Sequence, residues 1–301
     1  MLTSRRAPER ALLPEPPPLP WNSLPRQFAD LDCGRVAYLR HGSGPPLLLV
    51  HGIPTSSRLW EPLMGILGQH YDCIAPDLLG LGQSMPADGA DQASPGQATM
   101  LAELLDHLGI DESFAVFHDQ GGAHGMEFLR SHGARVPAVA FTNCVCYDNW
   151  PVPVIDMSAV LGRWGWVPWL SRLRLMQATL GMVLPWTVFR GSIPPALKRD
   201  WFRALDEGGP ALDAWVGYVT AQSARYTIEA EATLRAWDKP AHVLWAAQDR
   251  FLPVSWAVRL VQDLGGDDAR PELLPFAGHF WQAELPESGA RALMRFFDAQ
   301  R

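Results

Sequence analysis

The stretch FAVFHDQGG at residues 114–122 decides the fold. Its first four residues are apolar, as in a buried strand. Two glycines, Gly121 and Gly122, follow soon after, and a helical pattern continues through Phe128. A sharp turn that exposes one side chain tolerates little bulk around it, and glycine adds none. We therefore expect Asp119 to stand at a tight turn from a strand into a helix.

Apolar strands alternate with helical patterns on both sides of this turn. The expected strands cover residues 35–40, 46–50, 71–75, 114–117, 138–143, 242–246 and 272–274. The expected helices cover residues 59–67, 97–108, 256–264 and 287–297. Such alternation is typical of a parallel sheet that is covered on both faces. The fold class we predict is α/β, with a mostly parallel twisted sheet and helices on both of its faces.

The alternation stops over residues 150–236, where the sequence becomes helical, rich in tryptophan and interrupted by prolines. We interpret this segment as a helical lid inserted into a core of residues 31–149 and 237–301. Residues 1–30 contain a proline cluster and are expected to form an arm on the surface. A lid rich in indole rings and poor in charge would form a dry apolar pocket, which predicts a hydrophobic substrate.

Composition restricts the function further. The 301-residue chain has 48% apolar and 19% charged residues, a balance typical of a folded globular protein. Its net charge is -7 without an evident basic cluster, so nucleic acid and anionic membranes are not expected as main partners. No segment is apolar enough to span a membrane, and residues 1–20 lack the apolar stretch of a secretory signal. A small neutral substrate, with water as the second reactant, suits this chain best.

The cysteines carry no sign of a metal site. Cys33, Cys73, Cys144 and Cys146 lack the paired spacing and the neighbouring histidines of a zinc centre. We expect reduced thiols in a cytoplasmic protein that needs neither a metal ion nor a cofactor. The sequence leaves the oligomeric state open.

Polar residues gather at four predicted turns, at residues 51–57, 118–122, 248–253 and 278–281. In a parallel sheet such turns lie together at the carboxyl edge, where ligands bind. Asp119, Asp249 and His279 follow predicted strands in this chain order. Each alone has an ordinary explanation as a helix cap, a turn residue or a satisfied polar group. Together, at one edge and in this order, they predict a catalytic set.

This order and context resemble the α/β-hydrolase superfamily, in which the chain order is nucleophile, acid, histidine. An aspartate at the turn is similar to the branch of haloalkane dehalogenases and epoxide hydrolases. Phe117 departs from the small residue usual upstream of the nucleophile, so we expect the strand to relax there. The resemblance extends from about Val36 to the C-terminus and is weak in the lid. It implies Asp119 as nucleophile, His279 as general base and Asp249 as its acid partner.

A carboxylate nucleophile restricts the chemistry. Attack on an ordinary ester would yield an anhydride, whereas attack on a saturated carbon with a leaving group yields a stable alkyl ester. His279 would then activate a water against that ester. The resulting oxyanion needs two backbone N–H donors, for which Ile53 and Gln120 are placed. Should Asp249 prove remote from His279, Asp148 would be the substitute acid.

The resemblance leaves two substrate classes open. The loop at residues 51–57, with Trp60 after it, is similar to dehalogenase loops. Haloalkane dehalogenases hold the halide with a side-chain amide and an indole, at the positions of Ile53 and Gln120. Ile53 has no side-chain donor, and the amide of Gln120 could replace the indole only in part.

Epoxide hydrolases instead use lid tyrosines to protonate the opening oxygen. Tyr218 and Tyr226 lie in the predicted lid, and Tyr147 lies just before it. The ordinary explanation of lid tyrosines is packing within helices. An epoxide hydrolase is the leading hypothesis, and a haloalkane dehalogenase is the alternative.

Two further classes stay open. A hydrolase-like protein could bind a ligand without turnover, because a fold alone does not establish a function. The complete set of Asp119, Asp249 and His279 counts against that class. A cofactor-free lyase or a hydrolase of strained lactones would also suit a carboxylate nucleophile, since ring strain makes attack at carbon feasible.

Overall fold

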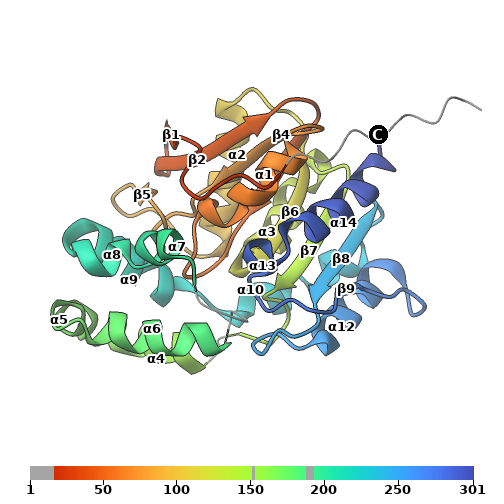
Figure 1. Cartoon of the computed structure of the whole chain (residues 1–301). Coiled ribbons are helices and arrows are strands. Elements are labelled where there is room, and N and C mark those ends of the chain that lie inside the picture. The colour runs from red at the N-terminus through yellow and green to blue at the C-terminus, as the bar shows by residue number, and fades with distance from the viewer. Residues whose placement is uncertain (1–16, 151–152, 188–192) are drawn as a thin grey trace, which may run out of the picture.

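The computed structural model describes residues 17–150, 153–187 and 193–301, so much of the predicted N-terminal arm lies outside the described residues. Nine strands of the described chain form one sheet in the order β1-β2-β4-β3-β6-β7-β8-β9, with β5 paired to β2 (Figure 1). Their bounds are β1 Gln27–Leu31, β2 Gly34–Gly42, β3 Pro46–Val50, β4 Asp72–Pro76, β5 Met85–Pro86, β6 Phe114–Asp119, β7 Val139–Cys144, β8 Ala241–Ala246 and β9 Glu272–Leu274.

Pairing is antiparallel at one end of the sheet and parallel through the rest. β2 pairs antiparallel with β1, β4 and β5. From β4 through β3, β6, β7 and β8 to β9, every pairing is parallel. The parallel strands are nearly continuous apolar runs because helices cover both of their faces. The α/β fold class predicted from the alternation is thereby confirmed.

The predicted arm, residues 1–30, extends too far, because β1 begins at Gln27. Residues 27–31 already belong to the sheet and pair with β2. Ala29 is the one fully buried residue of this strand, so no apolar alternation reveals it. β5 has only two residues and is too short to show any pattern.

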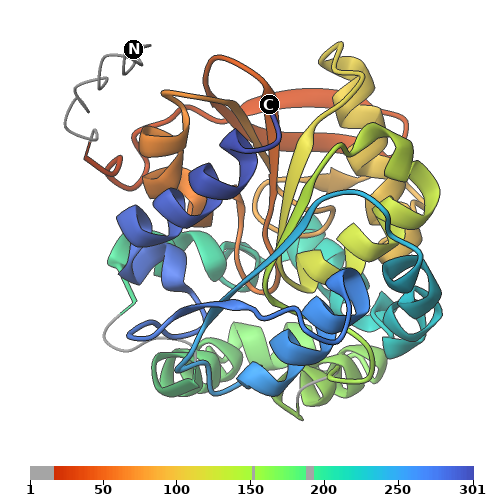
Figure 2. The same cartoon turned by 90° about the vertical axis from the view of Figure 1, so that its right-hand side faces the viewer.

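Helices cover both faces of the sheet and enclose two apolar cores (Figure 2). One face carries α1 Glu61–Leu67, α13 Trp281–Glu284 and α14 Pro286–Asp298. The other face carries α2 Ser94–His107, α3 Gln120–His132 and α12 Val254–Gly265. Two short 3-10 helices, η1 Ser57–Trp60 and η2 Gly133–Arg135, precede α1 and follow α3.

A group of helices lies between β7 and β8, in the interval expected for the lid, and we call this group the lid. Its members are α4 Pro153–Arg163, α5 Val167–Arg172, α6 Leu175–Thr187, α7 Pro195–Trp201, α8 Arg203–Glu207, α9 Gly209–Ala221, α10 Ala224–Glu229 and α11 Glu231–Arg235. Most of these helices gather at one end of the sheet (Figures 1 and 2). Within the ranges that the structure describes, no helix combines the length and apolar character needed to cross a bilayer.

The bulk of Phe117 is accommodated by the helix after the turn. A Cβ on Gly125 of α3 would lie 2.2–2.5 Å from three ring atoms of Phe117. The ring also packs against Phe141, with a centroid separation of 5.7 Å. The space that the motif usually gains from a small strand residue is thus supplied by a glycine in the helix.

We expect Gly125→Ala to lower the free energy of unfolding by about 1–3 kcal/mol, because a methyl would be forced into a packed core. Denaturant unfolding would measure the change. Gly181→Ala in α6 is the matched control, since a Cβ there lies 3.7 Å from its nearest neighbour, on Lys198. Alanine also favours a helix over glycine, so the control should lose no stability. An unchanged free energy of unfolding in Gly125→Ala would show that Phe117 does not need the space beside this glycine.

Candidate active site

Asp119 stands at the junction of β6 and α3 with an unusual backbone. Its φ of 54° and ψ of -130° are rare for a residue with a side chain. The turn is crowded, because a Cβ on Gly121 would lie 2.4 Å from the carbonyl oxygen of His51. A Cβ on Gly52 would lie 2.1 Å from Oδ1 of Asp119. Both glycines are therefore needed to bring two segments of backbone against this carboxylate.

A buried chain of hydrogen bonds joins Asp119, His279 and Asp249. Nε2 of His279 lies 2.8 Å from Oδ2 of Asp119. Nδ1 of the same ring lies 2.7 Å from Oδ2 of Asp249. All three side chains are buried. The structure therefore brings together the three residues that the sequence grouped by chain order.

Asn143 completes this chain and was not among the predicted site residues. Its Nδ2 donates to Oδ2 of Asp249 at 2.7 Å, and its Oδ1 accepts from the N–H of Ala246. The N–H groups of Phe251 and Leu252 donate to the other carboxylate oxygen of Asp249. Asn143 stands at the end of a predicted strand, and its position at the carboxyl edge was the signal available in the sequence.

The electrostatics favour a charged pair at neutral pH. Burial would lower the pKa of His279, but the charge of Asp249 and hydrogen bonds to both aspartates raise it to about 10. Burial would raise the pKa of Asp119, yet the hydrogen bond and the charge of His279 hold it below its usual value. The resting site therefore holds a carboxylate at Asp119 and an imidazolium at His279.

Two backbone amides converge on the other oxygen of Asp119. The N–H of Ile53 donates to Oδ1 at 2.9 Å, and the N–H of Gln120 donates to the same atom. Both residues are buried, with less than 5% of their surface exposed. Oδ1 thus lies between two donors while Oδ2 faces His279, so the two oxygens have distinct surroundings.

The side chain of Gln120 links this turn to the lid. Nε2 of Gln222, just after α9, donates to the backbone carbonyls of Gln92 and Tyr218 at 3.0 and 2.9 Å. Because those partners only accept, the amide of Gln222 must turn its oxygen toward Gln120. Nε2 of Gln120 donates to that oxygen at 3.2 Å. Oε1 of Gln120 is then left buried without a partner among the described residues.

The three candidate tyrosines are placed differently. The hydroxyl of Tyr218 lies 2.9 Å from Nε2 of His124. Burial raises the pKa of Tyr218 strongly, and the charge of Asp119 adds to it, so the hydroxyl lies within electrostatic reach of that carboxylate. The hydroxyl of Tyr147 instead bonds to Asp263 at 2.7 Å.

Tyr226, Trp60 and Asp148 also make their described contacts away from Asp119. The hydroxyl of Tyr226 accepts from Arg225 at 3.1 Å. Trp60, the last residue of η1, is buried in the core, with its ring edge-on to His118 and Trp281. Asp148, with 69% of its side chain exposed, faces Arg259, and the position of Asp249 makes a substitute acid unnecessary.

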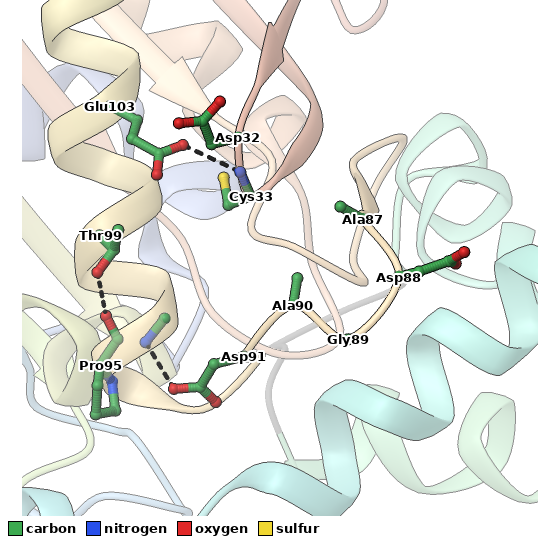
Figure 3. Close-up of a pocket in the computed structure, with 11 residues that line it drawn as sticks. Asp32, Cys33, Ala87, Asp88, Gly89, Ala90, Asp91, Pro95, Thr99 and Glu103 are labelled. Carbon is green, nitrogen blue, oxygen red and sulfur yellow. Dashed lines mark hydrogen bonds between the residues drawn. The ribbon is translucent and has the colours of Figure 1, made fainter.

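The described residues offer little support for other centres. Among them, no group of three or more His, Cys, Asp and Glu side chains is suited to hold a metal ion, and the cysteines are unpaired. A pocket of about 400 Å³ opens beside α2 and the turn between β1 and β2 (Figure 3). Its acidic lining includes Asp32, Asp88, Asp91 and Glu103 but none of the residues around Asp119.

Several known proteins resemble this chain, two of them over most of its length and one over less than half. Haloalkane dehalogenase 2 of Mycobacterium tuberculosis is 28% identical over 94% of this chain and 98% of its own. A cis-3-alkyl-4-alkyloxetan-2-one decarboxylase of Xanthomonas campestris is 26% identical over 74% of this chain and 76% of its own. A soluble epoxide hydrolase of Corynebacterium is 35% identical over 41% of this chain and 44% of its own. The model of the alpha/beta hydrolase fold family matches residues 45–286, and the chain therefore belongs to that family.

Proposed function

We propose that this hydrolase opens epoxides of small apolar molecules through a covalent ester at Asp119. The observation that carries the proposal is that the two oxygens of this carboxylate have different hydrogen-bond partners. Oδ1 is held by two backbone amides, and Oδ2 faces His279. The same arrangement suits both halves of the reaction, the formation of the ester at Asp119 and its hydrolysis.

In the first half, Oδ2 attacks a ring carbon from the side opposite to the ring oxygen. A carbon–oxygen bond forms with Asp119 as the ring bond breaks, and its electron pair stays on the former ring oxygen. That oxygen takes up a proton. Tyr218 is the candidate donor, because its buried hydroxyl experiences the charge of Asp119, whereas the hydroxyls of Tyr147 and Tyr226 make their described hydrogen bonds to Asp263 and Arg225. The imidazolium of His279 can restore the proton.

In the second half, the ester carbonyl oxygen is Oδ1, which already lies between the amides of Ile53 and Gln120. Esterification removes the charge of Asp119 and so removes part of what raises the pKa of His279. The neutral imidazole then takes a proton from water, which attacks the ester carbon. The two amides stabilise the oxyanion on Oδ1. Collapse breaks the bond to the alkyl oxygen, which takes the proton of the new carboxyl group and leaves as the diol. Asp119 is then again a carboxylate and His279 an imidazolium, as at the start.

The side chain of Gln120 favours an oxygen leaving group over a halide. A halide accepts hydrogen bonds and needs donors around it, but Ile53 has no side-chain donor. Gln120 commits one of its two amide N–H groups to Gln222, and its carbonyl oxygen has no hydrogen-bond partner among the described residues. That oxygen can accept from the hydroxyl that ring opening creates, whereas it would repel an anion. This inverts the donor role that a dehalogenase would require of Gln120.

We expect Gln120→Met to lower kcat/KM for diol formation from an epoxide such as styrene oxide by about 2–10-fold. That range corresponds to one lost hydrogen bond. Gln177→Met is the matched control, since Gln177 is a lid glutamine whose Oε1 also lacks a described partner. The control should leave the rate unchanged. An unchanged rate in Gln120→Met as well would show that the amide oxygen does not serve the substrate.

Halide release and carbon dioxide release are the two competing reactions, and both should be measured beside diol formation. The full-length relative named as a dehalogenase favours halide release from bromoalkanes, and the relative named as a decarboxylase favours carbon dioxide release from a β-lactone. We expect the diol to exceed both products at equal substrate concentrations. Halide or carbon dioxide as the main product would replace the epoxide assignment.

A further inference from the structure

Large apolar side chains are exposed along one stretch of the lid, from residue 164 to residue 182. Between 48% and 74% of the surface is exposed in six of them, and we call this set the lid patch: Trp164, Trp166, Trp169, Leu173, Leu175 and Met182. They come from α5, α6 and the turns before and after α5. Met157 of α4 is also exposed and lies near the patch in sequence, whereas Phe28, Leu273 and Phe276 lie outside the lid. A concentration of this kind marks an interaction surface.

The lid patch is not needed for the core of the lid. In α5 the buried side chains are Val167 and Ser171, while Trp166 and Trp169 stay about half exposed. These two indoles contact each other edge to face, with centroids 5.9 Å apart. Gly165, at φ 73° with open space around it, turns the chain between Trp164 and Trp166. The helix thus carries apolar residues on the side that faces away from its own packing.

The segment around the lid patch is basic, although the chain as a whole is acidic. Residues 153–187 contain Arg163, Arg172 and Arg174 against one acid, Asp156, which gives a net charge of +2 beside -7 for the chain. Arg174 pairs with Asp206 at 3.2 Å. Within the described chain, no salt bridge involves Arg163 or Arg172. The total charge of the chain conceals this local excess.

We propose that the lid patch docks on the surface of an anionic lipid bilayer. Indole rings favour the boundary between lipid and water, where one end is apolar and the other hydrated. Arginines beside them would meet lipid phosphates, and their stems would cover apolar surface. A second copy of the chain fits less well, because a two-fold interface would bring two copies of the same basic surface together. The lid would then collect apolar substrates where they concentrate.

The test is co-sedimentation of the full chain with vesicles. We expect binding to vesicles of equal parts phosphatidylcholine and phosphatidylglycerol at low salt. Binding should be at least about tenfold weaker with phosphatidylcholine alone or in molar salt, because the attraction is partly electrostatic. Trp164→Ser/Trp169→Ser should abolish it, and Arg163→Gln/Arg172→Gln should weaken it about tenfold.

Phe276→Ser is the matched control, since Phe276 is as exposed as Trp164 but lies outside the lid. It should bind vesicles like the parent chain. Because the substituted residues are exposed, the unfolding temperature of every variant should stay unchanged. Failure to bind the mixed vesicles, or equal binding by the tryptophan variant, would overturn the proposal. Light scattering that shows a dimer lost in the tryptophan variant would assign the lid patch to a second copy instead.

Discussion

His279→Gln should convert this enzyme into a reagent that reacts once and stops. Attack by Asp119 needs the carboxylate, which keeps its two backbone donors from Ile53 and Gln120 in the variant. Release needs a base to activate water, and glutamine is none. We expect steady-state turnover to fall by about 10⁴-fold or more. Intact-protein mass spectrometry after exposure to styrene oxide should show one added substrate mass per chain.

Asp119→Asn is the second variant to be tested in this experiment. An amide is a far weaker nucleophile than a carboxylate, so this variant should neither turn over nor gain mass at first. A protein that only binds its ligand would gain no mass in either variant. A serine nucleophile in the loop at residues 51–57 would leave activity in Asp119→Asn and put the label on that loop.

Gly52→Ala should have the second-largest effect. The new methyl would lie 2.1 Å from Oδ1 of Asp119 and 2.4 Å from the backbone nitrogen of Gln120. It cannot be accommodated without moving the carboxylate or one of its two donors. Loss of one oxyanion donor costs about 10²–10³-fold in turnover, and displacement of the nucleophile adds to it.

We expect kcat of Gly52→Ala to fall by at least about 10²-fold while the fold is kept, as circular dichroism and the unfolding temperature would show. Gly181→Ala, with room for its methyl in α6, should keep full activity. Normal turnover in Gly52→Ala would mean that the close approach of this loop to Asp119 is not part of the reaction.

The sheet and the chain Asp119–His279–Asp249 could be predicted because their signals are local. Buried parallel strands are visible as apolar runs, and the turns after them lie at one edge whatever the details of packing. The order of the three residues therefore sufficed to group them. β1 was hidden because its exposed face carries no apolar alternation.

What could not be predicted depends on contacts between distant segments. The sequence suggests that Gln120 is a donor. Gln222, about a hundred residues later, sets the orientation of the Gln120 amide, which leaves the oxygen without a partner in the part of the chain that the structure describes. Likewise nothing near Tyr147 shows that its hydroxyl is taken by Asp263. The direction of a side chain is set by partners that the local pattern does not contain.

A buried ionic cluster illustrates the same limit. Arg26, before β1, contacts Asp77 at 3.0 Å and Asp200 of the lid at 2.8 Å. Asp200 also bonds to Ser56, in the loop that carries the amide of Ile53. The N-terminal segment, the lid and the loop beside Asp119 are therefore tied together by residues far apart in the sequence.

A single turnover in water labelled with heavy oxygen tests the central claim most directly. With the parent enzyme in excess over an epoxide, the oxygen added to the diol should come from Asp119, so the product should be unlabelled. The heavy oxygen should instead be found in the peptide that contains Asp119, because water attacks the ester carbon. Heavy oxygen in the first diol released, with none in that peptide, would mean that water attacks the substrate itself and would contradict the covalent mechanism.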